Sequence, residues 1–470
     1  MPDSRTIRHV LAGTLICLAL VGLSATYWAL AGQHSLLLRE DNPRIIEAQR
    51  DIVRGGIYDR NARPLAETVQ LENGLARRYN YPTTYSILGY YSLRYGVGGA
   101  ESAYDALLSG ARPIDSIADY FQRRILNLPQ IGADIMLSLD VEIQDALVRA
   151  LDGAAGTAIV LDARSGAVLA LASQPSFDPN SLDTDWPALI EAEGKPFFNR
   201  ALQGNYPLGG NMAVIWLAQA IAGGFDLSWR FTGAAEPVDL GDGMIAGCVI
   251  RPGAAELTLG EALTYGCPAP FASFRQTDSA ATADVVLSPF AFQDPFTLPA
   301  FPQPATINLP ANVEGLSPAV LALRQALGQG DITTTPLHLA AVMAAIANDG
   351  LAVGPSLLTG SRPTDIDQWQ PQSLESASRR MMDAETARRL RSVMQDARAR
   401  LWPPPQDSPP SGAHVARSFS GDKTQLWLNG FVDADEAGAF AFVVLLEDRE
   451  DPSQLLSVGR ALFDSFASQR

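Results

Sequence analysis

A run of 22 uncharged residues at positions 10–31 constrains this 470-residue chain more than any other feature. It reads VLAGTLICLALVGLSATYWALA and, as a helix, would be about 33 Å long, enough to cross a bilayer. Arg5 and Arg8 precede it and favour a cytoplasmic N-terminus. We therefore predict a cytoplasmic tail at 1–9, a single-pass anchor at 10–31 and an extracytoplasmic bulk. A cleaved signal peptide is the competing interpretation, because Ala29-Leu30-Ala31 has the pattern of a cleavage site.

The composition is that of a globular protein. Apolar residues make up 47% of the chain and charged residues 18%, and the net charge of −16 disfavours a nucleic-acid partner. The four histidines are scattered and no Cys/His cluster has metal-ligand spacing, so we expect no metal and no other cofactor. Cys248 and Cys267 would both be exported, which leaves two alternatives open: one disulfide or two buried free thiols.

Hydrophobic periodicity predicts both strands and helices. Ile135, Leu137 and Leu139 alternate as in a strand, and Asp140 then suits the N-cap of a helix over 141–151. A hairpin follows, with strands at 156–161 and 167–173 on either side of a turn. Further helices are predicted at 257–265, 318–328 and 336–348.

Several motifs resemble class B penicillin-binding proteins. Residues 54–61, RGGIYDRN, resemble the element that opens the non-catalytic pedestal of that family, and 327–350, LGQGDITTTPLHLAAVMAAIANDG, resembles a signature of its transpeptidase core. The resemblance implies an α+β chain with a pedestal at 32–135 and a transpeptidase-like domain at 136–470. That domain is expected to have the penicillin-binding transpeptidase fold, a five-stranded antiparallel sheet flanked by helices.

The first catalytic motif of the family is not present. Residues 206–209, Tyr-Pro-Leu-Gly, resemble the Tyr-Pro-Pro-Gly turn that precedes the family's Ser-x-x-Lys. The nucleophile then falls on Gly210 and the base on Ala213. A serine hydroxyl needs an adjacent base, and the chain has only two lysines, Lys195 and Lys423, whereas arginine cannot act as a base.

The other two motifs are also degenerate. The family's Ser-x-Asn position reads Gly266-Cys267-Pro268. Residues 427–431, WLNGF, resemble the strand that follows Lys-Thr-Gly, and three residues between Lys423 and Trp427 are too few for a strand end, a turn and a new strand. The resulting register places strands at 413–419, 425–432 and 438–447 with a turn at 420–423, so the third motif reads Arg417-Ser418-Phe419.

These losses predict a pseudoenzyme of the bacterial cell membrane, with no catalytic residue and a structural or regulatory role in cell-wall assembly. Its expected partners are peptidoglycan peptide or membrane proteins of wall synthesis. One alternative is an active D,D-transpeptidase or hydrolase with a non-standard nucleophile such as Cys267 or Thr264. Another is a pure interaction module of the wall-synthesis machinery.

Overall fold

The computed structural model describes residues 4–27, 52–72, 74–111, 130–277, 283–304, 316–329, 332–364, 366–372, 377–406, 408–433 and 438–468. The chain divides into two compact units, of which one contains the N-terminal helix together with Gln70–Leu75, and the other contains Arg54–Val69, Ala76–Pro113 and Ile131–Arg470. The end of the predicted anchor at 28–31, its cleavage-site alternative and the first part of the predicted pedestal, 32–51, lie outside the described residues.

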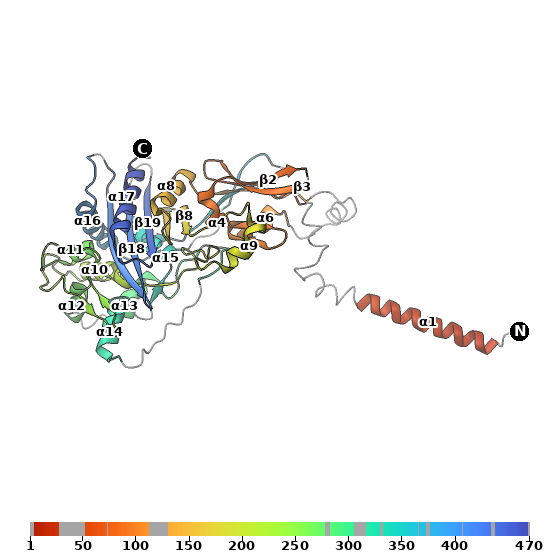
Figure 1. Ribbon diagram of the computed structural model, residues 1–470, viewed down its shortest axis with the longest axis horizontal. Coiled ribbons are helices and arrows are strands. Elements are labelled where there is room, and N and C mark those ends of the chain that lie inside the picture. The colour runs from red at the N-terminus through yellow and green to blue at the C-terminus, as the bar shows by residue number, and fades with distance from the viewer. Residues whose placement is uncertain are drawn as a thin grey trace. The chain divides into compact units, whose positions relative to one another are not determined.

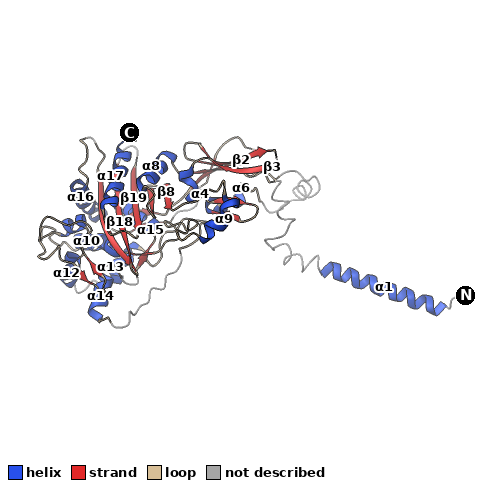
Figure 2. Cartoon of the chain, viewed as in Figure 1, coloured by secondary structure: helices blue, strands red, loops and turns tan. Residues whose placement is uncertain are grey.

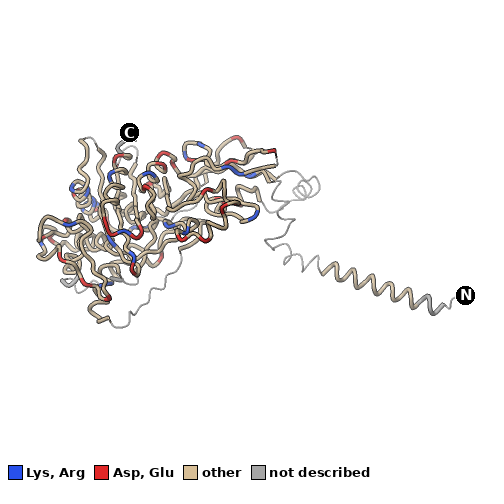
Figure 3. The backbone as a smooth tube through the Cα atoms, in the orientation of Figure 1, with Lys and Arg blue, Asp and Glu red and all other residues tan. Residues whose placement is uncertain are grey.

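Helix α1, Ser4–Tyr27, contains residues 10–27 of the predicted membrane segment (Figure 1). Among the described residues it is the one helix long and apolar enough to cross a membrane, with a mean hydropathy of 2.0 over His9–Tyr27. No Lys, Arg, Asp or Glu lies in that stretch (Figure 3). A signal sequence near an N-terminus meets the same criteria of length and composition.

The larger unit is built on a five-stranded antiparallel sheet (Figure 2). Its order is β17 (Ser411–Ser420), β18 (Lys423–Asp433), β19 (Ala439–Glu447), β7 (Gly156–Asp162) and β8 (Val168–Gln174). The α+β fold and the predicted register are confirmed, because Ser420 pairs with Lys423 across a tight turn and Lys423 begins β18. Gly421 supplies the left-handed conformation that this turn needs, with φ +63°.

Helices cover both faces of the sheet because its strands are apolar on both faces. One face, with Ile159, Trp427 and Val443, packs on α10 (Met212–Ala222), α11 (Leu259–Tyr265), α15 (Pro336–Ala347) and α16 (Ala384–Leu401). The other face, with Val160, Leu428 and Val444, packs on α8 (Val141–Leu151) and α17 (Ser453–Ser468). As predicted, Asp140 caps α8, where its side chain accepts a hydrogen bond from the Glu142 N–H.

A second, six-stranded sheet joins distant parts of the sequence. Its order is β15 (Gln370–Pro371), β14 (Leu358–Arg362), β6 (Asp134–Leu137), β1 (Ile57–Tyr58), β2 (Pro64–Leu71) and β3 (Gly74–Tyr79). Strand β14 pairs antiparallel with β6, so a segment near residue 360 completes a sheet that begins near residue 57. The sequence patterns did not predict this pairing.

Shorter elements complete the described chain. The helical ones are η2 (Pro82–Thr84), α4 (Tyr85–Leu88), α5 (Gly99–Ala103), α6 (Asp105–Leu108), α9 (Leu182–Glu191), η4 (Gly209–Asn211), α12 (Ala269–Thr277), α13 (Ala283–Leu287), η5 (Ser288–Phe290) and α14 (Pro318–Ala326). The extended ones are β4 (Tyr90–Ser92), β5 (Gly96–Gly98), β9 (Tyr206–Pro207), β10 (Val238–Asp239), β11 (Ile245–Ala246), β12 (Thr333–Thr334), β13 (Leu351–Val353) and β16 (Ser378–Arg380).

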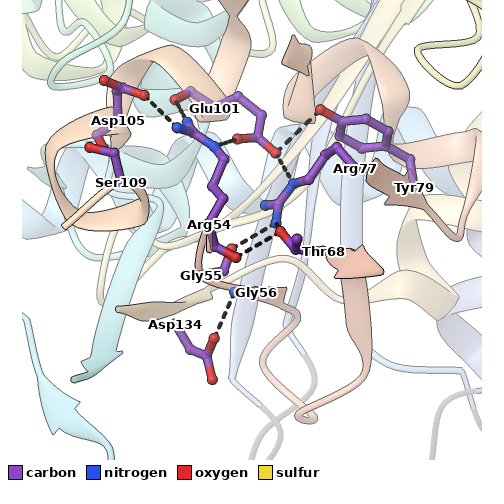
Figure 4. Close-up of polar contacts among 10 residues, drawn as sticks. All are labelled: Arg54, Gly55, Gly56, Thr68, Arg77, Tyr79, Glu101, Asp105, Ser109 and Asp134. Carbon is purple, nitrogen blue, oxygen red and sulfur yellow. Dashed lines mark hydrogen bonds and ion pairs between the residues drawn. The ribbon is translucent and has the colours of Figure 1, made fainter. Parts of the chain in front are cut away.

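The RGGIYDRN element has a structural role, which Figure 4 shows. Arg54 Nε lies 2.6 Å from the fully buried Glu101 carboxylate, and Arg77 Nε lies 2.7 Å from its other oxygen. Burial raises the pKa of Glu101, but the charges of Arg77 and Arg54 outweigh burial, and the pKa falls below its usual value. A Cβ on Gly55 would lie 1.9 Å from the Ala133 carbonyl oxygen, so only glycine fits there. Arg54 therefore links the segment before β1 to α5, and Gly55 allows that segment to pack against the Ala133 carbonyl.

Candidate functional site

The three degenerate motif positions meet around one cavity. Gly210 lies in η4 and Ala213 in the first turn of α10, residues 266–268 follow α11, and residues 417–419 lie on β17. The cavity has an empty volume of about 510 Å³ and is lined by seven of the eight predicted positions: Gly210, Ala213, Gly266, Cys267, Pro268, Arg417 and Phe419. The eighth, Ser418, is fully buried on the opposite face of β17, where its Oγ accepts a hydrogen bond from Trp427 Nε1 at 2.9 Å.

The backbone of η4 lies directly against β17. Gly209 has φ +55°, and a Cβ there would lie 2.4 Å from Ser418 Cβ, which is closer than real Cβ atoms approach. A Cβ on Gly210 would lie 3.2 Å from Ala416 Cβ. The Gly209 N–H also donates to the Gly328 carbonyl at 2.7 Å. A side chain at position 210 would therefore need β17 to move by a few tenths of an ångström.

The cavity lining is apolar, with Met212, Trp216, Leu263 and Phe271 among its walls. None of the described residues that line it carries a hydroxyl, an amine, an imidazole, a carboxylate or a free thiol. Its one charged residue is Arg417; burial lowers the pKa of this guanidinium, which nevertheless stays protonated and cannot act as a base.

Gln329 covers the edge of β17 at the cavity. Its side-chain Oε1 accepts a hydrogen bond from the Phe419 N–H at 3.2 Å. An edge strand with free N–H groups is a template on which an extended peptide can add as a further strand. Because Gln329 already takes the Phe419 N–H, that part of the edge is not free for such pairing.

Neither alternative nucleophile is available in the structure. Cys267 forms a disulfide with Cys248, which decides between the two alternatives that the sequence left open. The disulfide removes the free thiol that a Cys267 nucleophile needs. Thr264 is buried, and its hydroxyl donates to the Gly260 carbonyl of its own helix at 3.0 Å.

Comparison with known proteins identifies the family. The profile described as the penicillin binding protein transpeptidase domain matches residues 156–464, which is more than half of the chain, and the penicillin binding protein A dimerisation domain matches residues 54–133. The chain belongs to the class B penicillin-binding protein family.

Relatives of this family member match it over different lengths. The peptidoglycan D,D-transpeptidase PbpA of Mycolicibacterium smegmatis is 27% identical over 409 residues, which cover 83% of the chain and 82% of PbpA. The D,D-transpeptidase MrdA of Escherichia coli is 31% identical over 179 residues, 34% of the chain and 27% of MrdA. The crystal structure of PBPA from Mycobacterium tuberculosis superposes with a TM-score of 0.73 at 22% identity, covering 88% of this chain and 99% of PBPA. That structural likeness shows the shared fold.

A buried polar cluster lies on the sheet side of η4 in this family member, and no sequence pattern indicated it. Asn429 Nδ2 donates to Asn211 Oδ1 at 2.6 Å and lies 3.3 Å from His414 Nε2, while Asn211 Nδ2 donates to the Leu208 carbonyl at 2.9 Å. Burial lowers the pKa of His414 to about 4, so the imidazole is neutral at physiological pH. His414 does not line the cavity, and the cluster holds η4 against the sheet. Residues 211, 414 and 429 are too far apart in sequence to be grouped by any local pattern.

No metal site accompanies the cavity in the part of the chain that the structure describes, where no group of three or more His, Cys, Asp or Glu side chains could hold an ion. The cavity lining is apolar apart from one guanidinium, and among the described residues it offers no nucleophile and no base.

Proposed function

We propose that this chain is a membrane-anchored pseudoenzyme of the penicillin-binding protein family, which serves peptidoglycan assembly by binding and not by acyl transfer. Its relatives are named as peptidoglycan D,D-transpeptidases, which supports a role in the same process. In this proposal residues 10–31 anchor the chain, 32–135 form the pedestal and 136–470 the transpeptidase-like domain. The bulk is extracytoplasmic.

The observation that carries the proposal is the chemistry of the motif cavity. Acyl transfer through a covalent intermediate requires a nucleophilic side chain beside a base that takes its proton. Gly210 has no side chain, Ala213 has no base, and the segment 266–268 contributes a disulfide sulfur in place of a hydroxyl. Since these changes coincide at one cavity in a retained fold, loss of catalysis with retention of shape explains them together.

The retained cavity supports binding as the remaining role. Its lining is apolar, and one charged group, Arg417, lies at its wall. Peptidoglycan peptide or a segment of a membrane wall-synthesis protein could occupy such a site through an apolar side chain. Both occupants are part of the proposed function.

Fluorescent penicillin tests the proposal on the full-length chain in detergent. We expect no labelling of the natural sequence and none of the double variant Gly210→Ser, Ala213→Lys. The double variant remains inactive because serine at position 210 presses on Ala416 and the second and third motifs are still missing. Labelling of the natural sequence would overturn the proposal that the chain is a pseudoenzyme. Labelling of the double variant would overturn the claim that restoring the first motif alone is not enough for acylation. An active relative labelled in parallel serves as the positive control.

A further inference from the structure

A second cavity, with an empty volume of about 700 Å³, lies away from the three motif positions. Its walls come from the segment 86–99, from residues 173–203 and from Phe301 and Pro302, all within the larger compact unit. It shares no lining residue with the motif cavity.

Aromatic rings form one wall of this cavity. Tyr90 contacts Phe177 with a ring-centroid distance of 5.9 Å and Phe197 with one of 5.6 Å, and Phe177 contacts Phe197 at 4.7 Å. Tyr90 and Phe197 are only half-buried. The Tyr90–Phe177 contact is edge-to-face and the other two are tilted, and together these ring contacts form the wall without a ligand.

Two neighbouring tyrosines of strand β4 have their side chains on opposite faces of the strand. Successive side chains of a strand point to opposite faces, so Tyr90 lines the cavity while Tyr91 lies under the Arg54 guanidinium at 4.6 Å from the ring centroid. The two residues provide a matched pair: the same side chain on the same strand, inside and outside the cavity.

Three polar residues that line this cavity lack a full set of protein partners. Gln203 Oε1 accepts a hydrogen bond from the Asn199 N–H at 2.9 Å, which leaves its amide nitrogen as a donor. Ser86 Oγ accepts from the Ser173 N–H at 3.3 Å, which leaves its hydroxyl proton to donate. Among the described residues, no protein group is paired with the Gln203 amide nitrogen or with the Tyr90 hydroxyl. These groups can therefore serve a ligand.

The chemistry of the lining selects one class of ligand. None of the described lining residues is charged, so an ionic ligand would lose its hydration without gaining a counter-charge. An aliphatic chain would leave the Gln203 amide and the Ser86 and Tyr90 hydroxyls without partners. A pyranose ring satisfies both demands, because its C–H face packs on an aromatic ring and its hydroxyls exchange hydrogen bonds at the rim. We propose that this cavity binds an uncharged saccharide.

The class of ligand is inferred from the cavity alone and goes beyond the proposed pseudoenzyme role. Only the choice of the probe rests on the proposed role in peptidoglycan assembly. The probe is the β-1,4-linked tetramer of N-acetylglucosamine, an uncharged saccharide. Binding to the full-length chain in lipid nanodiscs is measured by saturation-transfer NMR on the acetyl methyl signals, with dissociation constants from titration. Fluorescent penicillin labelling is independent of this readout, so either proposal can fail without the other.

Three variants test the site. Tyr90→Phe removes only a hydroxyl, and we expect the dissociation constant to rise about two- to ten-fold, the effect of one lost hydrogen bond. Phe197→Leu keeps an apolar side chain but removes the ring, so a saccharide loses its stacking surface whereas an aliphatic ligand would bind about as before. The matched control Tyr91→Phe should leave binding unchanged. Thermal unfolding of each variant confirms that it is folded.

The proposal is supported if the tetramer binds and both cavity variants weaken binding while the control does not. It is overturned if the natural chain does not bind the tetramer at millimolar concentration. It is equally overturned if all three variants bind like the natural chain, or if Phe197→Leu binds normally.

Discussion

Gly209 and Gly210 determine how closely η4 approaches β17. Gly209 adopts the left-handed region with φ +55°, and its missing Cβ leaves room for Ser418 and the Arg417 carbonyl. At Gly210 the neighbouring atoms are 3.2 Å from a hypothetical Cβ, so the position to which the resemblance assigns the nucleophile is also a point of close approach to the strand. In the proposed pseudoenzyme, the missing side chain at position 210 is thus part of the local packing.

Gly209→Ala should destabilise the protein more than Gly421→Ala, its matched control. Both glycines have φ near +60°, so each substitution pays about 1–2 kcal/mol for a left-handed L-residue. Only Gly209→Ala adds an overlap with β17, which costs about another 1–3 kcal/mol, because the space around Gly421 is open. Urea unfolding measures the difference. Equal destabilisation of the two variants would contradict the close packing of η4 on β17.

At the scale of elements, the sequence predicted those that depend on local pattern. The strands β17 and β18 could be placed because residues 427–431 resemble a strand of the family and the three residues before Trp427 are too few to contain a turn. That left 420–423 as the turn, which the pairing of Ser420 with Lys423 confirms. The capping of α8 by Asp140 was equally local. The entry of β14 into the sheet of β1 could not be predicted, because a five-residue strand carries no signal for a partner more than two hundred residues away.

The candidate site likewise combines features that local sequence patterns predict with features that depend on distant contacts. The motif positions could be assigned one by one from their flanking residues, but the Cys248–Cys267 pairing and the cluster of Asn211, His414 and Asn429 depend on tertiary contacts. A single sequence does not contain those distances. The aromatic cavity beside Tyr90 was missed for the same reason, since its walls come from three separate segments.

The disulfide lies at the segment that the resemblance assigns to the second motif. Cys267 follows α11 directly and is bonded across 19 residues to Cys248. We expect the double variant Cys248→Ala, Cys267→Ala to lose about 3 kcal/mol of unfolding free energy, because the bond restricts the unfolded chain. Denaturant titration of both proteins provides the measurement. An unchanged midpoint would show that the two sulfurs are not bonded in solution.

At the scale of the whole molecule, two buried histidines make stability depend on pH. Burial lowers the pKa of His338 and of His414 to about 4, against 6.5 for an exposed imidazole. Between these values the unfolded chain binds protons that the folded chain excludes, so stability rises with pH in this window. The contribution of each histidine is therefore complete above pH 6.5 and is lost as the pH falls towards 4.

We expect the free energy of unfolding to fall from pH 6.5 towards 4, by at most about 3 kcal/mol for each histidine. The variant His414→Gln should reduce the slope while leaving the contribution of His338, which separates the imidazole from the carboxylates. Denaturant unfolding at a series of pH values gives both slopes. A slope that His414→Gln leaves unchanged would contradict the burial of a neutral imidazole beside Asn429.

The central claim is that the retained transpeptidase fold cannot form an acyl-enzyme, and intact-protein mass spectrometry tests it most directly. The purified chain is incubated with excess penicillin G beside penicillin-binding protein A of M. tuberculosis, whose penicillin G acyl-enzyme complex has been solved. We predict that the relative gains the mass of one penicilloyl group while this chain keeps its unmodified mass. A stoichiometric penicilloyl adduct on this chain would contradict the account.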